Sequence, residues 1–388
     1  MNNVVIVTGE LSGENHAVSL VRELDGLSTF EFSAIGSAAL AGAGVRLIHD
    51  YHDISLVGFE ILTKMGHIRN AYRILKEHLE TSRPDLVILI DFPGFNLLLL
   101  SRLTKRLGIP TIYFIPPQLW SWWTEGRIKM IRERIDLVLC IFPFEEEMYR
   151  SRHVPVEYVG HPYISSVRAS MTRAEFCRFA GVDPGKQLVT MMAGSRESEV
   201  GKHLPILHAV IEELSRRIDN FSILLPVADS LDAKLFAPLV AGRKGDTIPI
   251  KGHTHDCLAF SAAALVKSGS STLEAALLGV PSVVYYRLSW FSYHLARMVA
   301  KVPYIALPNL IAGKEVFPEF VQKIEPAAIA ESLVSMIKNG QSTVRKDLDG
   351  IREKLSTAGR DPYQTAADRI VRFLERKNAP LPKTSEIR

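Results

Sequence analysis

The sequence has few cysteines and no apolar stretch long enough to cross a bilayer. Its three cysteines, Cys140, Cys177 and Cys257, lie far apart and lack CxxC spacing, which excludes a disulfide framework and a zinc site. No run approaches the roughly 18 apolar residues of a membrane-spanning helix. The opening residues, MNNVVIVTGE, lead straight into a strand-like run without the features of a signal peptide. We therefore expect a protein of the reducing cytosol.

A strong charge imbalance is also missing. Lys and Arg number 46 and Asp and Glu 42, which gives a formal net charge of +4. So small a basic excess indicates phosphate-bearing or membrane partners only where it is clustered. The 388 residues are 47% hydrophobic and 23% charged, as in soluble globular proteins of about two domains.

Several cofactor and nucleophile motifs are absent. TGELSGENHA (8–17) is not a G-x-G-x-x-G fingerprint, AGSRESEV (193–200) is not a P-loop, and there is no G-x-S-x-G elbow. The pairs His49-x-x-His52, His253-x-His255 and Asp347-x-Asp349 lack further ligands. We therefore expect neither a metal nor another cofactor.

Short apolar runs alternate with longer amphipathic stretches throughout the chain. This rhythm is typical of βαβ units and of a parallel sheet that is buried on both faces. The runs are VVIVT (4–8), FEFSAI (30–35), LVILID (86–91), TIYFI (111–115) and LVLCI (137–141), then LVTMMA (188–193), FSILLP (221–226), TIPIK (247–251), AALVK (263–267) and SVVYY (282–286).

The rhythm pauses at YVGHPYISS (158–166), which is typical of a linker. We therefore expect an α/β protein with two Rossmann-like doubly wound domains that face each other across a cleft. The first domain spans residues 1–164, the second 165–345, and a helical segment 346–388 follows. The last dozen residues are expected to be loose.

One carboxylate interrupts the apolar stretch LVILIDFPGFNLLLL (86–100). Ligands of parallel sheets bind at the carboxyl ends of the strands, and Pro93 and Gly94 end the strand close to Asp91. Asp91 could therefore act as a base in a cleft. It could equally N-cap or brace the following turn, and the residues alone do not decide between these roles.

Two loops of the second half are typical of phosphate-binding sites. Gly194, Ser195 and Arg196 follow a strand and precede a helix, where free amides and a guanidinium attract phosphate. The second loop comprises Ser268, Gly269, Ser270, Ser271, Thr272 and Glu274. It could face a nucleotide, with Glu274 accepting ribose hydroxyls. Alternatively, Ser271 and Glu274 form a capping box that only satisfies amides at the helix start.

Two stretches combine apolar and basic residues in a way that suits an interfacial helix. One is LSWFSYHLARMVAKV (288–302) and the other is residues 55–76. Both could instead pack in a core or at a dimer interface. In residues 55–76 the apolar members precede the basic ones and are Leu56, Val57, Phe59, Ile61, Leu62 and Met65.

The motifs together resemble those of the lipid-A-disaccharide synthase family over nearly the whole chain. They are GELSGE (9–14), SLVGFEIL (55–62), DFPGFN (91–96), PPQLWSW (116–122), FPFEEEMY (142–149), VGHP (159–162), AGSRESEV (193–200), SGSSTLEAALLGVPSVVYYR (268–287) and LPNLIAG (307–313). The resemblance implies an inverting glycosyltransferase of GT-B architecture. Such an enzyme joins UDP-2,3-diacylglucosamine to 2,3-diacylglucosamine 1-phosphate through a β-1,6 linkage and releases UDP without a metal.

The resemblance also implies roles for individual residues. Asp91 matches the proposed base, and Arg196 matches the residue expected at the donor diphosphate, with Ser195 and the 268–274 loop around the nucleotide. Further family-motif positions are Glu10, Ser12, Asn96 and Asn309. The acylated substrates favour the membrane interpretation of residues 55–76, with the protein on the cytoplasmic face of the inner membrane. A C-terminal helix that crosses back and a homodimer are also implied.

The chain departs from the family pattern at three positions. Glu14 replaces the usual Asp of the first motif, Gly94 stands where many members carry a second Asp, and Trp123 occupies a position that is commonly Arg. The rival interpretations are a UDP-sugar 2-epimerase of similar fold, which needs no lipid surface, and a nucleotide-binding scaffold without catalysis, in which Asp91 is only a turn brace.

Overall fold

The computed structural model of the protein describes residues 1–50, 52, 65–120, 125–240, 247–287, 303–339 and 342–378. The expected membrane-associating residues Leu56, Val57, Phe59, Ile61 and Leu62 lie outside these ranges, as do residues 288–302, Trp123 and the last residues of the chain. Met65 begins a helix, but its side chain is not among those described.

The chain divides into two units, and each is described by itself. The first comprises residues 1–162 and 356–388, and the second residues 163–355. The terminal segment expected over 346–388 is thus shared: α17 (Ser342–Leu355) belongs to the second unit and α18 (Pro362–Asn378) to the first.

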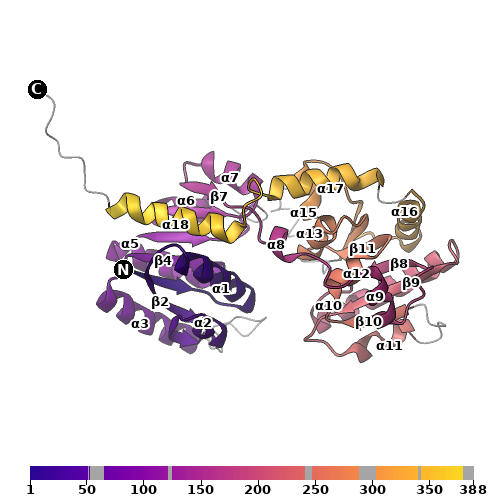
Figure 1. Ribbon diagram of the computed structural model, residues 1–388, viewed down its shortest axis with the longest axis horizontal. Coiled ribbons are helices and arrows are strands. Elements are labelled where there is room, and N and C mark those ends of the chain that lie inside the picture. Colours follow the sequence, from indigo (N-terminus) through magenta and orange to yellow (C-terminus); the bar gives the residue numbers. More distant parts are fainter. Residues whose placement is uncertain are drawn as a thin grey trace, which may run out of the picture. The chain divides into compact units, whose positions relative to one another are not determined.

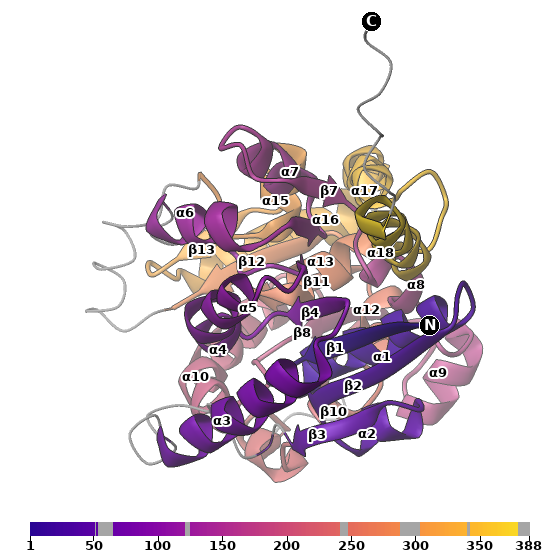
Figure 2. The ribbon, with the colours of Figure 1, turned by 90° about the vertical axis from the view of Figure 1, so that its left-hand side faces the viewer.

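The first unit is built on a parallel seven-stranded sheet with the order β3-β2-β1-β4-β5-β6-β7. Figure 2 shows β1, β2 and β3 side by side. All five side chains of β4 are buried, as in strands that helices cover on both faces. The strands are β1 (Asn2–Val7), β2 (Phe30–Gly36), β3 (Arg46–Asp50), β4 (Leu86–Ile90), β5 (Thr111–Phe114), β6 (Leu137–Cys140) and β7 (Val156–Tyr158).

Helices cover both faces of this sheet. Side chains of α3, α5, α6 and α7 share one hydrophobic core with the strands. α1 connects β1 to β2, which lies on the opposite side of β1 from β4. Because such connections are right-handed, α1 lies on the other face of the sheet, where it packs beside α18 (Figure 1). The helices are α1 (Leu11–Asp25), α2 (Ala38–Gly42), α3 (Met65–Ser82), α4 (Pro93–Phe95), the π-helix η2 (Asn96–Leu100), α5 (Ser101–Leu107), α6 (Glu125–Arg134) and α7 (Pro143–Arg150).

The second unit repeats the architecture with a parallel six-stranded sheet in the order β10-β9-β8-β11-β12-β13. Its strands are β8 (Gln187–Met191), β9 (Phe221–Val227), β10 (Thr247–Lys251), β11 (Ala263–Lys267), β12 (Ser282–Tyr286) and β13 (Glu319–Val321). Its helices are α8 (Tyr163–Ser166), α9 (Arg173–Ala180), α10 (Glu197–Ser215), the 3₁₀ helix η3 (Ala233–Phe236), α11 (Ala237–Val240), α12 (Thr254–Ala259), α13 (Ser270–Leu277), α15 (Leu307–Ala312), α16 (Pro326–Asn339) and α17.

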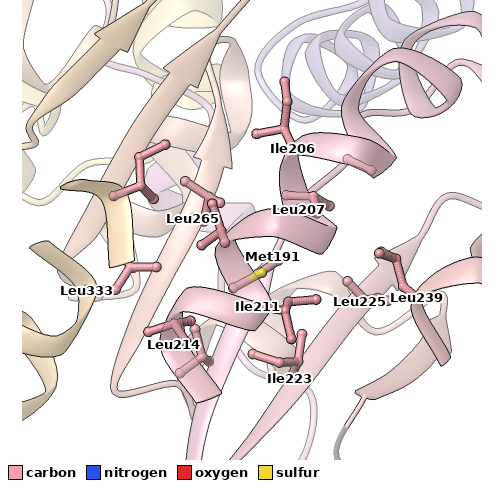
Figure 3. Packing of buried hydrophobic residues seen from close by; sticks show 14 of the residues in the cluster. Met191, Ile206, Leu207, Ile211, Leu214, Ile223, Leu225, Leu239, Leu265 and Leu333 are labelled. Atoms are coloured by element: carbon pink, nitrogen blue, oxygen red, sulfur yellow. The ribbon is translucent and has the colours of Figure 1, made fainter. Parts of the chain in front are cut away.

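The larger hydrophobic core of the second unit lies between the sheet and the helices α10 and α16 (Figure 3). Ile206, Leu207, Ile211 and Leu214 recur at helical spacing along α10, and all four are buried in this cluster. They pack against strand side chains such as Leu265, and burial of each such side chain contributes about 1.5–3 kcal/mol. This packing fixes the start of α10, and with it the loop after β8.

The structure confirms the predicted fold class of two doubly wound α/β domains. All ten predicted strands are present. The three strands that the sequence did not predict, β3, β7 and β13, are edge strands, where burial is weaker. None of the described helices is long and apolar enough to cross a membrane.

Candidate functional site

Asp91 directly follows β4, at the carboxyl end of the central strands of the first unit. Both Asp91 and Phe92 have left-handed backbone conformations, with φ of 46° and 50°. Such conformations are uncommon outside glycine and persist only where the surroundings hold them. Here the Asp91 carbonyl accepts hydrogen bonds from the Tyr113 hydroxyl at 2.7 Å and from the Asn96 amide at 2.9 Å.

The carboxyl group of Asp91 shares a hydrogen bond with that of Glu10, the residue before α1. Burial, followed by the charge of Glu10 and this hydrogen bond, raises the pKa of Asp91 to about 7, while the Phe92 amide opposes the shift. Two carboxyl groups at one site cannot both ionise cheaply. The pair therefore holds a proton near neutral pH, which suits an acid or base.

The loop between β1 and α1, which contains Gly9, packs directly against the turn at Asp91. A Cβ added to Gly9 would lie 2.1 Å from Cγ of Phe92, whereas one added to Gly94 would meet nothing within 4 Å. Only glycine therefore permits this approach at position 9. The α4 helix has Phe92 at its N-cap and no side-chain cap, so the capping role considered for Asp91 is wrong. The Phe92 amide does bond the Asp91 carboxylate locally.

Asn96 and Glu14 support the site from within the protein. The buried Asn96 amide donates to the carbonyls of Val7, Ile90 and Asp91 at 3.3, 3.2 and 2.9 Å, and so ties the ends of β1 and β4 together. Glu14 is also buried.

The carboxylate of Glu14 accepts hydrogen bonds from the Ser37 amide and hydroxyl, both at 2.6 Å. Glu14 therefore anchors the start of α2, whereas Ser12 is exposed on the first turn of α1.

The second unit contains a cavity of about 560 Å³ at the carboxyl ends of its strands. Four strand-end loops contribute to it, as expected for a ligand site in a parallel sheet. The lining residues are Arg168, Ser170, Met192, Gly194, Ser195, Pro226, Ala228, Gly252, His253, Thr254, His255, Asp256, Lys267, Gly269, Ser270, Ser271 and Glu274.

The start of α13 forms one wall of this cavity. The helix begins at Ser270, and its N-cap is Gly269, whose φ is 149°. The capping-box alternative is therefore wrong, because Ser271 lies inside the helix. Glu274 instead faces the cavity, where Nε2 of His255 lies 3.5 Å from its Oε2. This hydrogen bond, against the opposing effect of burial, raises the pKa of His255.

A chain of charged side chains connects α10 with the end of β11. The Lys267 ammonium lies 2.9 Å from Oε2 of Glu199, and the Arg196 guanidinium lies 3.4 Å from Oε1. Burial acts to raise the pKa of Glu199, but the hydrogen bond and charge of Lys267 outweigh it, and the pKa falls below its usual range. Lys267 lines the cavity. Arg196 is 74% exposed and lies beside Ser195, outside that lining.

Two predicted site residues are buried beside the loops and not in the cavity lining. The Thr272 hydroxyl donates to the Gly269 carbonyl at 2.8 Å. The Asn309 amide donates to the Phe317 carbonyl at 2.8 Å and to the Glu319 carboxylate at 2.9 Å. Both side chains hold loops in place.

The sequence did not identify several lining residues. Asp256 is buried and accepts from the Ser170 amide and hydroxyl at 2.8 and 2.7 Å, which orders the start of the unit. Lys267 ends AALVK, and His255 follows TIPIK, so a systematic inspection of strand ends would have found both. No group of three His, Cys, Asp or Glu side chains suited to a metal occurs in the part of the chain that the structure describes.

Comparisons with known proteins bear on both units. Residues 4–370 match a family model described as lipid-A-disaccharide synthetase. The chain is 35% identical to the lipid-A-disaccharide synthase of Geobacter sulfurreducens over 363 residues, which cover 92% of this chain and 94% of the relative. It is 38% identical to that of Syntrophus aciditrophicus over 362 residues, with the same coverage.

Solved structures resemble the chain in fold. A UDP-GlcNAc 2-epimerase from Neisseria meningitidis superposes with a TM-score of 0.57 at 17% identity, over 97% of this chain and all of the other. The calicheamicin glycosyltransferase gives a TM-score of 0.62 at 14% identity, over 98% of this chain and all of the other. At such identities the likeness concerns the fold alone.

Proposed function

The chain belongs to the lipid-A-disaccharide synthase family, and from this we propose that it transfers 2,3-diacylglucosamine from UDP-2,3-diacylglucosamine to the 6-hydroxyl of 2,3-diacylglucosamine 1-phosphate. The products are the β-1,6-linked disaccharide 1-phosphate and UDP. The observation that carries the proposal is the family match over residues 4–370. The carboxyl pair of Asp91 and Glu10 and the phosphate-compatible cavity offer the groups that this reaction needs.

Asp91 is assigned as the general base. In a single displacement with inversion, the acceptor hydroxyl loses its proton as its oxygen bonds to the anomeric carbon, and the bond from that carbon to the diphosphate oxygen breaks. A carboxylate whose pKa is about 7 is ionised often enough at neutral pH and is basic enough to take that proton. Glu10 is assigned a positioning role, because it shares the hydrogen bond and tunes the basicity of Asp91.

The cavity of the second unit is assigned to UDP. Glu274, which lines the cavity, is assigned to accept ribose hydroxyls, and Ser270, Ser271 and the first amides of α13 are assigned to donate to phosphate. Lys267, with Arg196 from the neighbouring loop, is assigned to supply positive charge for the leaving diphosphate, and the Ser195 hydroxyl is assigned to donate a hydrogen bond to it. These cations and amides support a transfer that needs no metal. Gly269 permits the turn, while Thr272 and Asn309 hold the loops.

Acylated substrates also favour peripheral association with the cytoplasmic face of the inner membrane. Residues 55–76 remain the predicted contact, and a homodimer remains a prediction as well. The epimerase alternative rests on a likeness of fold alone, whereas the family match favours the synthase.

The test is to mix the purified full-length protein with both acylated substrates, in detergent and without added metal. We expect a disaccharide 1-phosphate and UDP in equal amounts, measured by mass spectrometry and by a coupled UDP assay. A folded protein that forms no disaccharide would overturn the proposal. A product isomeric with the UDP-sugar, formed without acceptor, would support the epimerase instead.

A further inference from the structure

The carboxyl group of Glu145, on the first turn of α7, is buried and takes no part in the proposed transfer. Its Oε1 accepts a hydrogen bond from the Trp120 indole at 3.2 Å, and its Oε2 accepts one from the Phe142 amide at 3.4 Å. The second contact caps the start of α7. The first contact reaches the loop after β5, and it joins PPQLWSW (116–122) to FPFEEEMY (142–149), two motifs to which the proposed function gives no role.

The side chain of Trp120 is held at its apolar edge as well. Its ring meets Phe144 edge-on, with the centroids 5.4 Å apart and an angle of 86° between the planes. Phe144 in turn stacks on the buried ring of Phe142 at 5.2 Å. Burial raises the pKa of Glu145 to about 8, although the hydrogen bonds from Phe142 and Trp120 lower it. A largely neutral acceptor and an aromatic pair therefore fix this indole.

The loop 115–120, which ends at Trp120, is stiff and strained. Ile115 has a φ of 53°, which is uncommon for a β-branched residue, and a residue that precedes proline prefers an extended backbone. Pro116 and Pro117 follow with fixed φ angles and are both buried. A strained backbone persists only where its surroundings hold it. Trp120 is the end of this loop that Glu145 holds.

The other end of the loop is bonded to the assigned base. The carbonyl of Ile115 accepts from the amide of Asp91 at 3.3 Å, and the amide of Ile115 donates to the Leu139 carbonyl at 3.1 Å. Asp91 also has a left-handed backbone, with a φ of 46°. Two strained turns therefore share one hydrogen bond, so a shift of the Ile115 carbonyl would move the main chain of Asp91.

We propose that Glu145 is a positioning residue for Asp91. Its hydrogen bond to Trp120 anchors the loop 115–120, whose first carbonyl holds the amide of Asp91. The proposal rests on the proposed function, because it takes Asp91 as the base. A residue that only capped α7 would need the Phe142 contact alone, so the contribution of Trp120 separates positioning from capping.

The test compares variants of the full-length protein. Glu145→Leu removes both acceptor oxygens at similar volume, and Trp120→Phe keeps an aromatic ring but removes the N–H donor. Glu145→Gln keeps an acceptor for the indole. The control is Glu147→Leu, the same chemical change at an exposed position of α7. Thermal unfolding gives the range in which each variant is folded, and all assays are run below it.

We expect the substitutions to act on kcat. Misplacement of a catalytic group by about 1 Å costs about 100-fold, so kcat should fall about 30-fold in Glu145→Leu and about tenfold in Trp120→Phe. KM for both substrates should stay within about twofold, since neither residue is assigned to bind them. Glu145→Gln should recover most of the loss. Glu145→Leu combined with Trp120→Phe should be no slower than Glu145→Leu alone, because both act through one contact.

A second measurement needs no substrate. Amide hydrogen exchange is followed by mass spectrometry on the peptide that contains Asp91. In Glu145→Leu and Trp120→Phe this peptide should exchange faster than in the wild type, because the Asp91 amide bonds the Ile115 carbonyl less often. Glu145→Gln and Glu147→Leu should match the wild type, and peptides of the second unit serve as the internal reference.

Normal kcat in Trp120→Phe beside a low kcat in Glu145→Leu would overturn the proposal and reduce Glu145 to a helix cap. A higher KM for the acceptor at unchanged kcat would also overturn it, because the loop would then bind the acceptor itself. If the wild type forms no disaccharide but the exchange pattern is as expected, the proposed function alone is contradicted. If the wild type is active and both variants keep its kcat and exchange, only the role of Glu145 is contradicted.

Discussion

The two units carry sites of opposite character at corresponding positions of the same fold. At the end of β4, a strained backbone holds Asp91 beside Glu10, and burial favours the protonated carboxyl. At the ends of β8 and β11, glycine turns present amides and cations to a cavity. Both units have a parallel sheet, so in the proposed mechanism the loop residues alone determine whether the carboxyl edge of the sheet handles a proton or an anion.

The difference also concerns how each loop is held. The Asp91 turn depends on side chains from β5 and η2, Tyr113 and Asn96, and on the contact of its own Phe92 ring with Gly9. The loop after β11 depends on glycine at position 269 and on short hydroxyl side chains, such as that of Thr272, which donates to the Gly269 carbonyl. We therefore expect the first site to tolerate little change in shape, and the second to respond mainly to changes in charge.

The largest expected effect is that of Asp91→Asn. The amide keeps the size of the side chain but cannot take a proton at neutral pH, so turnover should fall by about 10³-fold, within the range of general base catalysis. Binding of UDP, measured by calorimetry, should stay within about twofold, because the cavity belongs to the other unit. The control is Asp25→Asn at an exposed position, and turnover near normal in Asp91→Asn would remove Asp91 from its assigned role.

Lys267→Met should weaken the proposed anion-binding site of the second unit. It removes the ammonium from the cavity and leaves the half-buried Glu199 without its closest counter-ion. We expect kcat/KM for the UDP-sugar to fall about 100-fold, since a charge-assisted contact to the leaving group is lost. Lys202→Met on the exposed side of α10 is the matched control. Unchanged UDP affinity and turnover in Lys267→Met would place the diphosphate elsewhere.

Gly9→Ala tests the claim that the first site depends on shape. The new Cβ would lie 2.1 Å from the Phe92 ring, so the ring and the strained turn must move. Overpacking of this kind costs about 1–3 kcal/mol, and thermal unfolding should show it together with reduced turnover. Gly94→Ala is the control, because its Cβ meets nothing within 4 Å. Equal effects of the two substitutions would show that the contact with Phe92 does not limit the side chain at position 9.

Much of this arrangement could be predicted from the sequence, for physical reasons that also explain the failures. Interior strands such as LVILI are apolar throughout, because both faces are covered. The edge strand β3, RLIHD, has exposed and half-buried side chains and gives no such signal. The position of Asp91 at a strand end was predictable from Pro93 and Gly94, but its pairing with Glu10 joins residues distant in the chain.

The second site shows the same limit. Ser271 and Glu274 have the spacing of a capping box, yet the N-cap is Gly269, two residues before Ser271, and Glu274 bonds His255. Spacing alone cannot fix a helix start to one residue. Similarly, the side-chain amide of Asn309 forms hydrogen bonds with residues within 316–319. These contacts depend on how the loop before β13 folds.

The smallest expected effect is a shift in pH dependence in Glu10→Gln. In the wild type the base must be ionised, so kcat/KM should fall as the pH drops through about 7, the pKa of Asp91. The charge of Glu10 is one cause that raises this pKa, after burial. A neutral amide at position 10 removes the charge, so the acidic limb should move to lower pH by about one unit. The measurement is kcat/KM between pH 5 and 9, each variant scaled to its own maximum.

The direction of this shift separates a tuning role from a merely structural one. If Glu10 only held the loop, Glu10→Gln would lower kcat/KM equally at every pH, and the midpoint would stay in place. Glu23→Gln on the same helix changes the same charge away from the turn and should leave the profile unmoved. If the midpoint of the acidic limb rose in Glu10→Gln, Glu10 would stabilise the ionised form of Asp91. The contrast between an acid-pair site in the first unit and a cation site in the second would then no longer hold.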